Sequence, residues 1–518
     1  MTFTTSITVY DGAESIGGNK IHVEEAGRGV FLDFGKNFAK SGAFFSEFLN
    51  ERAGRGLNDA FFLGLIPKLN IYRKDLGTAD LSLTGYPSPR IDAVLLSHAH
   101  VDHFGNIGLL NENIPIVATP LSIAIMKGMQ DSSPTVGSDT IYFSKKEPND
   151  QSGLLLKSSR DSYQGRNFYC TAKPSDNLCE FLSCRPQGEK ARKSLVPGII
   201  SSYNNLDLPF EVEAFDVDHS IYGACAYLLN GQNTLAYSGD FRLHGKHGNT
   251  TRKFVEAAKD ASVLIIEGTR VTRKNACNAR EPVSEESVRE TCRAAVESAK
   301  GLVIADFSPL NFERLESFLS IAEKTGRELV VTAKDMYLFL ALSCTEMPCP
   351  LDRLKIYYEL KDRKNAKWET EVVMKQRPGQ YIDGAAVARN PDKYILCFSF
   401  FDMKNLLDIK PEGGTYIYSA CEAFSEEMEF DFKRLAEWLK FFKFDVKGFG
   451  LCAEGDMITP VFDAAFHASG HASPEDIAWA IDTIDPDIII PVHTQGHDWF
   501  AEKWENTRIV HDGERIEF

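Results

Sequence analysis

The chain has 518 residues, which is too long for one compact hydrophobic core and predicts two or more domains, or one domain with a large insertion. Its formal net charge of −16 argues against a protein that coats nucleic acid through overall charge, because such binding needs a basic surface. The sequence shows no CxxC pair, no leader-like start and no apolar run near the roughly 18 residues of a spanning helix, so we expect a reduced, cytoplasmic protein with no membrane role.

The first half of the chain alternates short apolar runs with turns, a pattern that is typical of β-strands. Between residues 132 and 195 this pattern gives way to polar sequence with Gly and Pro, which we interpret as a loop or a variable insertion. The first half therefore predicts a β-rich layered domain. Its expected strands lie within residues 6–12, 27–35, 91–100, 210–219 and 233–241.

From about Pro282 the sequence changes to alternating helices and strands, which implies parallel strands covered by helices in a Rossmann-like domain. The alternation ends near Phe444, and the last helix and strand are similar in style to the first half. We therefore predict a β-rich domain of residues 1–275 and 448–518, split by an inserted α/β domain of residues 276–447. The expected helices lie within residues 284–300, 312–326, 426–442 and 474–484, and the expected strands within 301–307, 327–333, 394–400, 415–420 and 487–493.

Any contact with nucleic acid must be local in a chain this acidic. Three basic stretches are candidates, although ordinary solvated surface explains each of them as well. They are Lys190, Arg192 and Lys193; Arg242, Lys246, Arg252 and Lys253; and Arg270, Arg273, Lys274 and Arg280.

The strongest functional signal is the sequence SHAHVDHFGN, which follows an apolar strand at residues 91–96. Alternate residues of an extended chain share a face, so His98 and His100 can reach one metal ion. Asp102 and His103, which enter a turn or the start of a helix, can face a second. Imidazole and carboxylate are the ligands expected for zinc, and manganese also tolerates them. The alternative is a polar loop with fortuitous histidines.

Three residues far along the chain favour the metal centre. His219, Asp240 and His493 each follow the end of a predicted strand, which is where sites in layered sheets are built. A fortuitous polar loop needs no such partners.

The HxHxDH sequence, followed by a strand-end His and a strand-end Asp, resembles the metallo-β-lactamase fold. This resemblance implies an α/β fold with an αββα sandwich. Asp33, in FLDFG, matches the first motif of that family and is expected to orient the histidine loop through hydrogen bonds, unless it only terminates its strand. The implied ligands are His98, His100 and His219 for one metal, Asp102, His103 and His493 for the other, and Asp240 as the bridge.

Segments after Asp240 resemble motifs A, B and C of the β-CASP nucleases, with Glu267 in VLIIEGTR, His471 in HASGHAS and His493 in PVHT. The resemblance covers nearly the entire chain and implies that the inserted Rossmann-like domain is a β-CASP domain. SGHAS and the opening GAESIGGN are similar to ribonuclease J. Motif A departs from that branch by reading Glu-Gly-Thr-Arg where Asp-Ser-Thr is usual, motif C by reading His-Thr-Gln where His-Gly-Glu is usual, and the chain ends soon after motif C.

The resemblance implies a metal-dependent ribonuclease in which two divalent metal ions, about 3.5–4 Å apart, activate a water molecule. Zinc is the expected metal and manganese the alternative. Asp102, Glu267 and His471 are the predicted catalytic residues: Glu267 fixes a site histidine and His471 protonates the departing 3′ oxygen, which gives 5′-phosphate and 3′-hydroxyl products. We expect 5′ to 3′ exonuclease activity. The candidates for binding the phosphate are Ser419, Ser469, Gly470 and Ala472, although tight-turn geometry explains such small residues equally well.

Other functions stay open on the sequence alone. An endoribonuclease and a DNA nuclease share these motifs, and base contacts that would tell RNA from DNA are not visible. A small ester or lactone fits less well because the large insertion would form a wall of a deep cleft. A catalytically inactive RNA-processing scaffold usually has replaced ligands, whereas all seven proposed ligands are present here. The expected partners are RNA and a second copy of the chain, as a homodimer.

Overall fold

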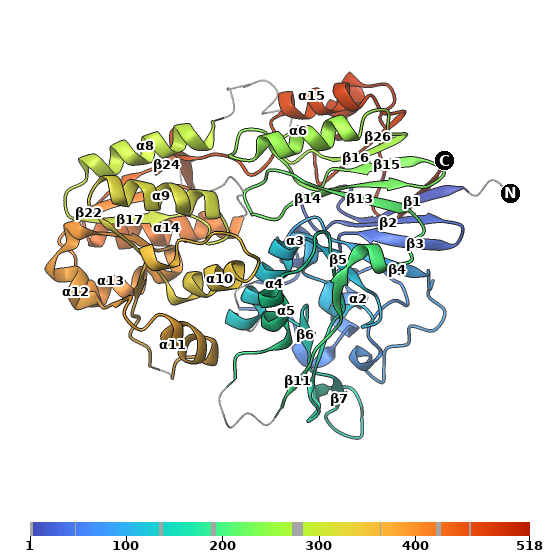
Figure 1. The fold of residues 1–518 in the computed structure, drawn as a ribbon, viewed down its shortest axis with the longest axis horizontal. Coiled ribbons are helices and arrows are strands. Elements are labelled where there is room, and N and C mark those ends of the chain that lie inside the picture. The colour runs from blue at the N-terminus through green and yellow to red at the C-terminus, as the bar shows by residue number, and fades with distance from the viewer. Residues whose placement is uncertain are drawn as a thin grey trace.

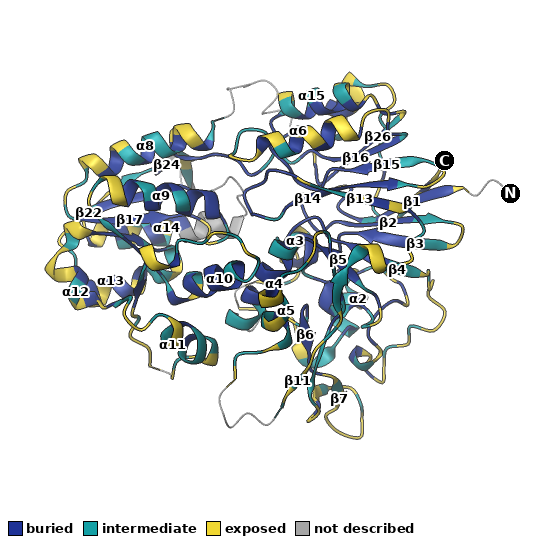
Figure 2. Cartoon of the chain, viewed as in Figure 1, coloured by how far each residue is buried: buried dark blue, intermediate teal, exposed yellow. Residues whose placement is uncertain are grey.

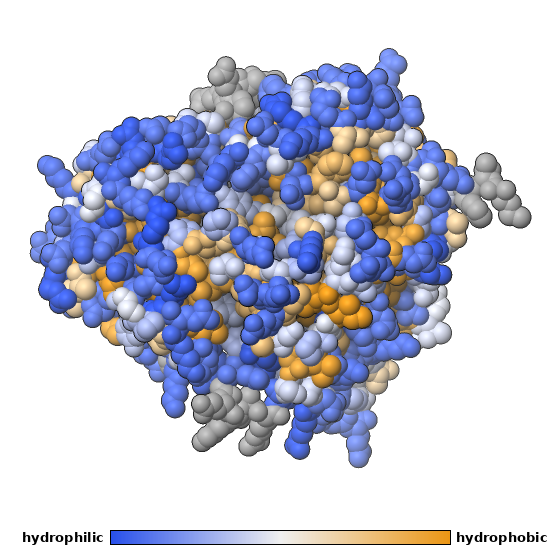
Figure 3. Space-filling model, viewed as in Figure 1, coloured by the Kyte–Doolittle hydropathy of each residue, from blue (hydrophilic) through white to orange (hydrophobic). Residues whose placement is uncertain are grey.

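The computed structural model describes residues 4–46, 48–133, 138–187, 193–271, 283–362, 364–420, 426–454 and 457–518. Figure 1 shows two regions: a pair of stacked sheets on the right, built from both ends of the chain, and a third sheet with its helices on the left. The face shown in Figure 3 is mainly hydrophilic, with apolar side chains in scattered areas.

The first sheet of the stacked pair has eight strands and contains the N-terminal part of the chain. Strands β1 and β2 pair antiparallel, with Ile7 opposite Val23, while β3, β4 and β5 run parallel. The sheet order is β12 (Ile200–Ser202), β10 (Phe168–Cys170), β5 (Ile116–Ala118), β4 (Ile91–Leu95), β3 (Arg28–Leu32), β2 (Lys20–Glu25), β1 (Thr5–Asp11) and β27 (Glu514–Glu517).

The second sheet of the pair has five strands and is completed by a strand from near the C-terminus. Strand β26 runs parallel to β16, with Ile490 opposite Ile265, so residues on either side of the long segment 268–487 lie next to each other. The order is β13 (Glu211–Asp216), β14 (Cys225–Asn230), β15 (Thr234–Tyr237), β16 (Val263–Glu267) and β26 (Ile488–Val492).

The residues of β16 show how the layers stack. Val263 and Ile265 point into a core shared with the eight-stranded sheet, whereas Leu264 and Ile266 point to the helices on the other side. Helix α4 (Pro120–Ser132) covers the opposite face of the eight-stranded sheet. Helix, sheet, sheet and helix therefore follow one another, and the strands are buried in Figure 2. The outer helices on the five-stranded side are α6 (Gly248–Ala257), α15 (Pro474–Ile484) and α16 (His497–Lys503).

The third sheet has seven strands, all parallel, with helices on both faces. Val303 and Ala305 pack against one set of helices, and Leu302 and Ile304 against the other. The order is β20 (Tyr381–Ile382), β19 (Lys355–Tyr357), β18 (Glu328–Val331), β21 (Tyr394–Cys397), β17 (Leu302–Asp306), β22 (Gly414–Tyr418) and β23 (Phe444–Lys447). The helices are α8 (Glu285–Ser298), α9 (Phe312–Lys324) and α10 (Ala333–Ser343) on one face, and α12 (Gly384–Arg389), α13 (Leu406–Ile409) and α14 (Glu426–Phe441) on the other.

Residues 132–195, predicted as a loop or a variable insertion, contain regular structure in their described parts, so the loop interpretation was wrong there. Its strand β10 lies inside the eight-stranded sheet, and a small three-stranded sheet lies beside it. These strands are two or three residues long, which is too short for an alternating pattern to show in the sequence. They are β6 (Tyr142–Phe143), β7 (Lys146–Pro148), β8 (Leu156–Ser158), β9 (Tyr163–Gly165), β10 and β11 (Leu195–Val196), with helix α5 (Asp176–Ser183).

The predicted fold class, an αββα sandwich with an additional α/β domain, is confirmed. The predicted boundaries at residues 275/276 and 447/448 stay a proposal, and the first of them falls outside the described residues. Within the described ranges, no helix is both long and apolar enough to cross a membrane. Lys190, Arg192, Arg273, Lys274 and Arg280 of the basic stretches also lie outside those ranges.

Candidate metal centre

The histidine loop joins β4 to the short helix α3 (Val101–Phe104). His98 and His100 lie in the extended part, and Asp102 and His103 in the first turn of the helix. The loop therefore brings His100 beside His219 and Asp102 and His103 beside His493, while His98 lies close to both groups. His98 and His103 are completely buried.

The carboxylate of Asp33 anchors this loop. It accepts hydrogen bonds from the backbone nitrogen of Ser97 at 2.7 Å, from the Ser97 hydroxyl at 2.7 Å and from the Tyr237 hydroxyl at 2.6 Å. Its Oδ2 lies 2.7 Å from Nδ1 of His103. Asp33 holds a left-handed backbone conformation, φ 58°, which Asp tolerates better than most residues. These contacts place Asp33 where its carboxylate can orient the loop.

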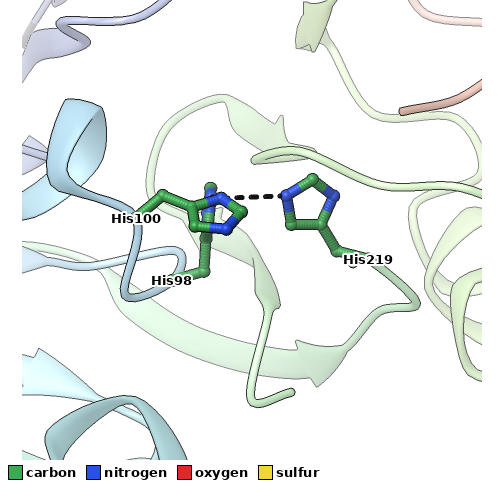
Figure 4. Close-up of side chains that lie close together, drawn as sticks. All are labelled: His98, His100 and His219. Carbon is green, nitrogen blue, oxygen red and sulfur yellow. Dashed lines mark hydrogen bonds between the residues drawn. The ribbon is translucent and has the colours of Figure 1, made fainter. Parts of the chain in front are cut away.

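Three imidazole rings form the first cluster (Figure 4). Nδ1 of His100 lies 2.9 Å from Nε2 of His98 and 3.2 Å from Nε2 of His219, which follows strand β13. Burial lowers the pKa of His98 and of His219, and it lowers the pKa of His100 to about 4 although Asp102 opposes it. The rings are therefore neutral, and their lone pairs meet in one small space.

A second cluster lies beside the first and shares Asp240. Oδ2 of Asp240 lies 3.1 Å from Nε2 of His103, 3.6 Å from that of His98 and 3.8 Å from that of His493. Asp102 completes the group, with Oδ2 3.2 Å from Nε2 of His493. Asp240 therefore stands between the two clusters, at the position predicted for a bridge.

Two atoms show that this arrangement suits cations. Among the described residues, Oδ1 of Asp240 is buried and has no hydrogen-bond partner, and Nε2 of His103 makes no well-aligned hydrogen bond although Oδ2 of Asp240 lies 3.1 Å away. Orphaned buried polar atoms are rare in folded proteins unless a water molecule or an ion satisfies them. Burial lowers the pKa of His103, but the carboxylates of Asp240, Asp102 and Asp33 outweigh it and raise that pKa well above its usual value. The cluster thus has an excess of negative groups that a cation would balance.

The outward-facing ring nitrogens support the same conclusion. Nδ1 of His98 lies 3.0 Å from the Ser97 hydroxyl, and Nδ1 of His493 lies 2.8 Å from the Thr269 hydroxyl. Nδ1 of His219 lies 2.5 Å from the carbonyl oxygen of Gly470. Histidines that bind metals characteristically hydrogen-bond through the other nitrogen in this way, which fixes their orientation. The residues present fit two divalent cations.

Glu267 and His471 lie at the edge of this centre. Oε2 of Glu267 is 2.9 Å from Nδ1 of His471, and Oε1 accepts a hydrogen bond from the backbone nitrogen of Phe241 at 3.0 Å. Burial lowers the pKa of His471, but Glu267 and Asp240 outweigh it and raise that pKa to about 9. Glu267 therefore holds a cationic His471, and the Thr269 hydroxyl, 2.6 Å from Oε2, connects it by hydrogen bonds to His493.

The four residues predicted to bind a phosphate are buried and engaged inside the protein. Ser419 has no exposed surface, and its hydroxyl donates to the carbonyl oxygen of Phe466 at 2.7 Å. The Ser469 hydroxyl accepts from the backbone nitrogen of His471 at 3.2 Å, and Ala472 belongs to the core beside the five-stranded sheet. The structure therefore gives no support to an open phosphate cradle. Small residues mark a tight turn in sequence, but they do not show which way it faces.

Several residues of the site were missed by sequence reasoning. Ser97, Tyr237 and Thr269 contact the predicted residues through single hydroxyl groups, and no spacing rule points to them. Arg242 was placed in a basic surface stretch, but it is completely buried. Its position two residues after Asp240 was the only available signal.

The stacked sheets and this histidine and aspartate centre are those of a metallo-β-lactamase fold, and comparisons with known proteins agree with this class. The model of the metallo-β-lactamase superfamily matches residues 64–137, which include the histidine loop. The chain is similar to ribonuclease J of Sinorhizobium meliloti (strain Sm2011 / Rm2011 / 2011), with 21% identity over 429 residues that make up 81% of this chain. It spans about 60% of the length of that relative.

The chain is also similar to a solved structure over almost its whole length. A protein of unknown function from Enterococcus faecalis V583 shares 22% identity, with a TM-score of 0.66, and the match covers 99% of this chain and 100% of that one. This likeness concerns the fold. The chain thus has the metallo-β-lactamase fold, and its resemblance to the ribonuclease J-like family is confirmed.

Proposed function

We propose that this chain is a metal-dependent ribonuclease of the β-CASP type that hydrolyses RNA phosphodiesters to 5′-phosphate and 3′-hydroxyl products. The observation that carries the proposal is the convergence of all seven predicted ligands on one buried site, with the orphaned Oδ1 of Asp240 among them. The similarity to a ribonuclease supports RNA as the substrate.

His98, His100 and His219 would hold one divalent metal ion, and Asp102, His103 and His493 the other, with Asp240 between them. Bound metal ions supply Lewis acidity and lower the pKa of water, and zinc is the proposed metal, with manganese as the alternative.

His471 and Glu267, at the edge of the centre, are the residues that would supply the proton that the leaving group needs. Water attack on phosphorus breaks the bond from phosphorus to the 3′ oxygen, which takes a proton as it leaves. His471 is cationic and lies 3.8 Å from Asp240, so it is the proposed donor of that proton. Glu267 keeps its ring oriented. Removal of such a donor typically costs about 10² to 10⁴ in rate.

Exonuclease action from the 5′ end is the proposed mode, and internal cleavage is a second candidate. The burial of Ser419, Ser469, Gly470 and Ala472 favours the second, because a terminal phosphate needs accessible donors. The homodimer and the cytoplasmic location stay predictions.

The test is digestion of one RNA that carries a 5′ monophosphate and a 3′ label, beside the same RNA with a 5′ hydroxyl and beside DNA, with zinc or manganese. We expect cleavage of RNA by the wild-type chain and none by His98→Ala. His511→Ala is the matched control, because its side chain is 70% exposed and pairs with Glu14 at the surface.

Progressive shortening of the 5′-monophosphate RNA alone would establish the exonuclease, and discrete internal cuts whatever the 5′ end would establish the endonuclease. Preferential cleavage of DNA would reassign the substrate. If a chain that holds its metal ions cleaves neither polymer, the nuclease proposal is overturned. The alternative of a catalytically inactive RNA-processing scaffold would then stand.

A further inference from the structure

Two buried arginines lie beneath the histidine segment, defined here as residues 466–471. Arg242 belongs to the loop that carries Asp240, and Arg314 belongs to helix α9 of the seven-stranded region. Neither side chain exposes more than 1% of its surface. Buried guanidinium groups are stable only when carboxylates and carbonyl groups surround them.

Glu285, the first residue of helix α8, joins the two arginines. Its Oε1 lies 2.9 Å from Nη1 of Arg242, and its Oε2 lies 2.8 Å from Nη2 of Arg314. Burial raises the pKa of Glu285, but the two guanidinium groups outweigh it and keep that pKa below its usual value. One carboxylate of the seven-stranded region is therefore shared between the two regions of the molecule.

Each arginine also reaches the histidine segment. Arg242 donates to the carbonyl oxygen of Ser469 at 3.2 Å, and Arg314 lies 3.5 Å from that of Phe466. Arg314 bonds Ser419 as well, whose hydroxyl holds the same Phe466 carbonyl at 2.7 Å. The segment is thus held near both of its ends by groups that meet at Glu285.

The position of the segment matters because its backbone adjoins the metal-facing histidines. His244 donates to the Ser469 carbonyl at 2.9 Å, and the next carbonyl, that of Gly470, is the partner of His219. His471 follows directly and faces Glu267 and Asp240. A shift of the Ser469 carbonyl would move His471 with it, since only one residue separates them.

We propose that Glu285 is a positioning residue that couples the seven-stranded region to the metal centre, by holding Arg242 and Arg314 against the segment that carries His471. This inference rests on the proposed function for its reaction, but the contact network does not depend on which polymer is cut. The two other acidic neighbours of Arg242, Asp218 at 3.1 Å and Glu313 at 2.8 Å, hold the same guanidinium group.

Glu285→Gln tests the coupling with little change of shape. Both guanidinium groups are donors, and a glutamine amide offers one acceptor oxygen and one donor nitrogen, so it satisfies one arginine and repels the other. Glu286→Gln is the matched control, because its side chain is 63% exposed and pairs with Arg289 at the surface.

The first readout does not depend on activity. Hydrogen exchange of residues 464–473 in the metal-free chain, measured by mass spectrometry, should be at least about tenfold faster in Glu285→Gln than in Glu286→Gln, which corresponds to the loss of one charge-assisted hydrogen bond. Bound metal, measured by elemental analysis, should stay equal in both.

The second readout compares two leaving groups. RNA cleavage should fall about 100-fold in Glu285→Gln, whereas bis(4-nitrophenyl) phosphate, whose leaving group departs without a proton, should be hydrolysed at close to the wild-type rate. In a His471→Ala background, Glu285→Gln should cause no further loss on RNA, because both changes act through one histidine.

Equal exchange rates in the two variants, or equal losses on both substrates together with lost metal, would overturn the inference in favour of a purely structural role. Arg242→Lys provides a second variant if Glu285→Gln does not fold, because lysine keeps the charge but cannot bridge Glu285 and Ser469 with a planar fork; the same pattern is expected from it. A wild-type chain that holds metal but hydrolyses neither substrate would instead contradict the proposed function, and the exchange readout would still decide the coupling.

Discussion

Both the sandwich and the seven-stranded sheet place carboxylates at the ends of their strands, but they use them differently. In the sandwich, Asp33 and Asp240 turn toward histidines, and one atom of Asp240 has no partner among the described residues. In the seven-stranded region, Asp306 ends β17, while Asp335 and Asp402 lie in the first turns of the helical segments after β18 and β21, where they close capping boxes. A strand-end carboxylate thus marks a site only when it converges with other donors.

Asp306 illustrates the second use most clearly. It ends β17, and its carboxylate accepts a hydrogen bond from the Tyr416 hydroxyl on the neighbouring strand β22. Burial raises the pKa of Asp306 to about 7, although Tyr416 opposes this. Its hydrogen-bonding capacity is used within the fold, in contrast to that of Asp240.

The largest effect is expected from exchanging one acid in each region for its amide. Asp240→Asn should lose bound metal and all nuclease activity, because the amide removes the charge shared between the clusters. Asp402→Asn should keep both and lose only about 1 kcal/mol of stability, the usual net value of a hydrogen bond such as those it accepts from Ser399. Elemental analysis and RNA cleavage measure the difference. Full activity in Asp240→Asn would show that the carboxylates of the two regions do not differ in role.

The two hydrophobic cores should respond alike, since both are fully buried. Ile265→Ala in the core between the stacked sheets and Ile304→Ala in the seven-stranded sheet should each lower the free energy of unfolding by about 2–5 kcal/mol. Denaturant unfolding measures both. A loss below about 0.5 kcal/mol, typical of surface changes, would show that the region concerned is not packed as described.

The smallest effect concerns pH. The pKa of Asp306 is about 7 in the folded chain against 3.8 in an unfolded one, so the folded state holds the proton more tightly and stability falls as pH rises from about 4 to 7. Asp306→Asn should remove that fall, on the order of 1–3 kcal/mol. Unfolding of both chains at pH 4.5 and pH 7.5 measures it. If the wild-type chain instead gains stability relative to Asp306→Asn from pH 4.5 to pH 7.5, the pKa of Asp306 is not raised by folding.

Local pattern predicted a β-rich layered domain, the additional α/β region and the histidine loop, whereas the αββα sandwich and the ligand set followed from the resemblance to the metallo-β-lactamase fold. His98 and His100 are two residues apart in extended chain, and His219, Asp240 and His493 follow apolar strands. The burial of Arg242 and the role of Glu285 were not predictable, since they depend on contacts between distant segments. Helix α10 was missed because it is buried on nearly all sides and therefore has little amphipathic periodicity.

The pairing of β26 with β16 has a consequence for the synthesis of the chain. His493 follows β26, so the second cluster cannot form until the whole segment 268–487 has been made and the late strand has added to the edge of β16. The N-terminal part of a nascent chain presents an unpaired strand edge during that interval, which is the kind of surface that chaperones protect. The second cluster would therefore form only after β26 has been made, when the seven-stranded region has had time to fold as a unit.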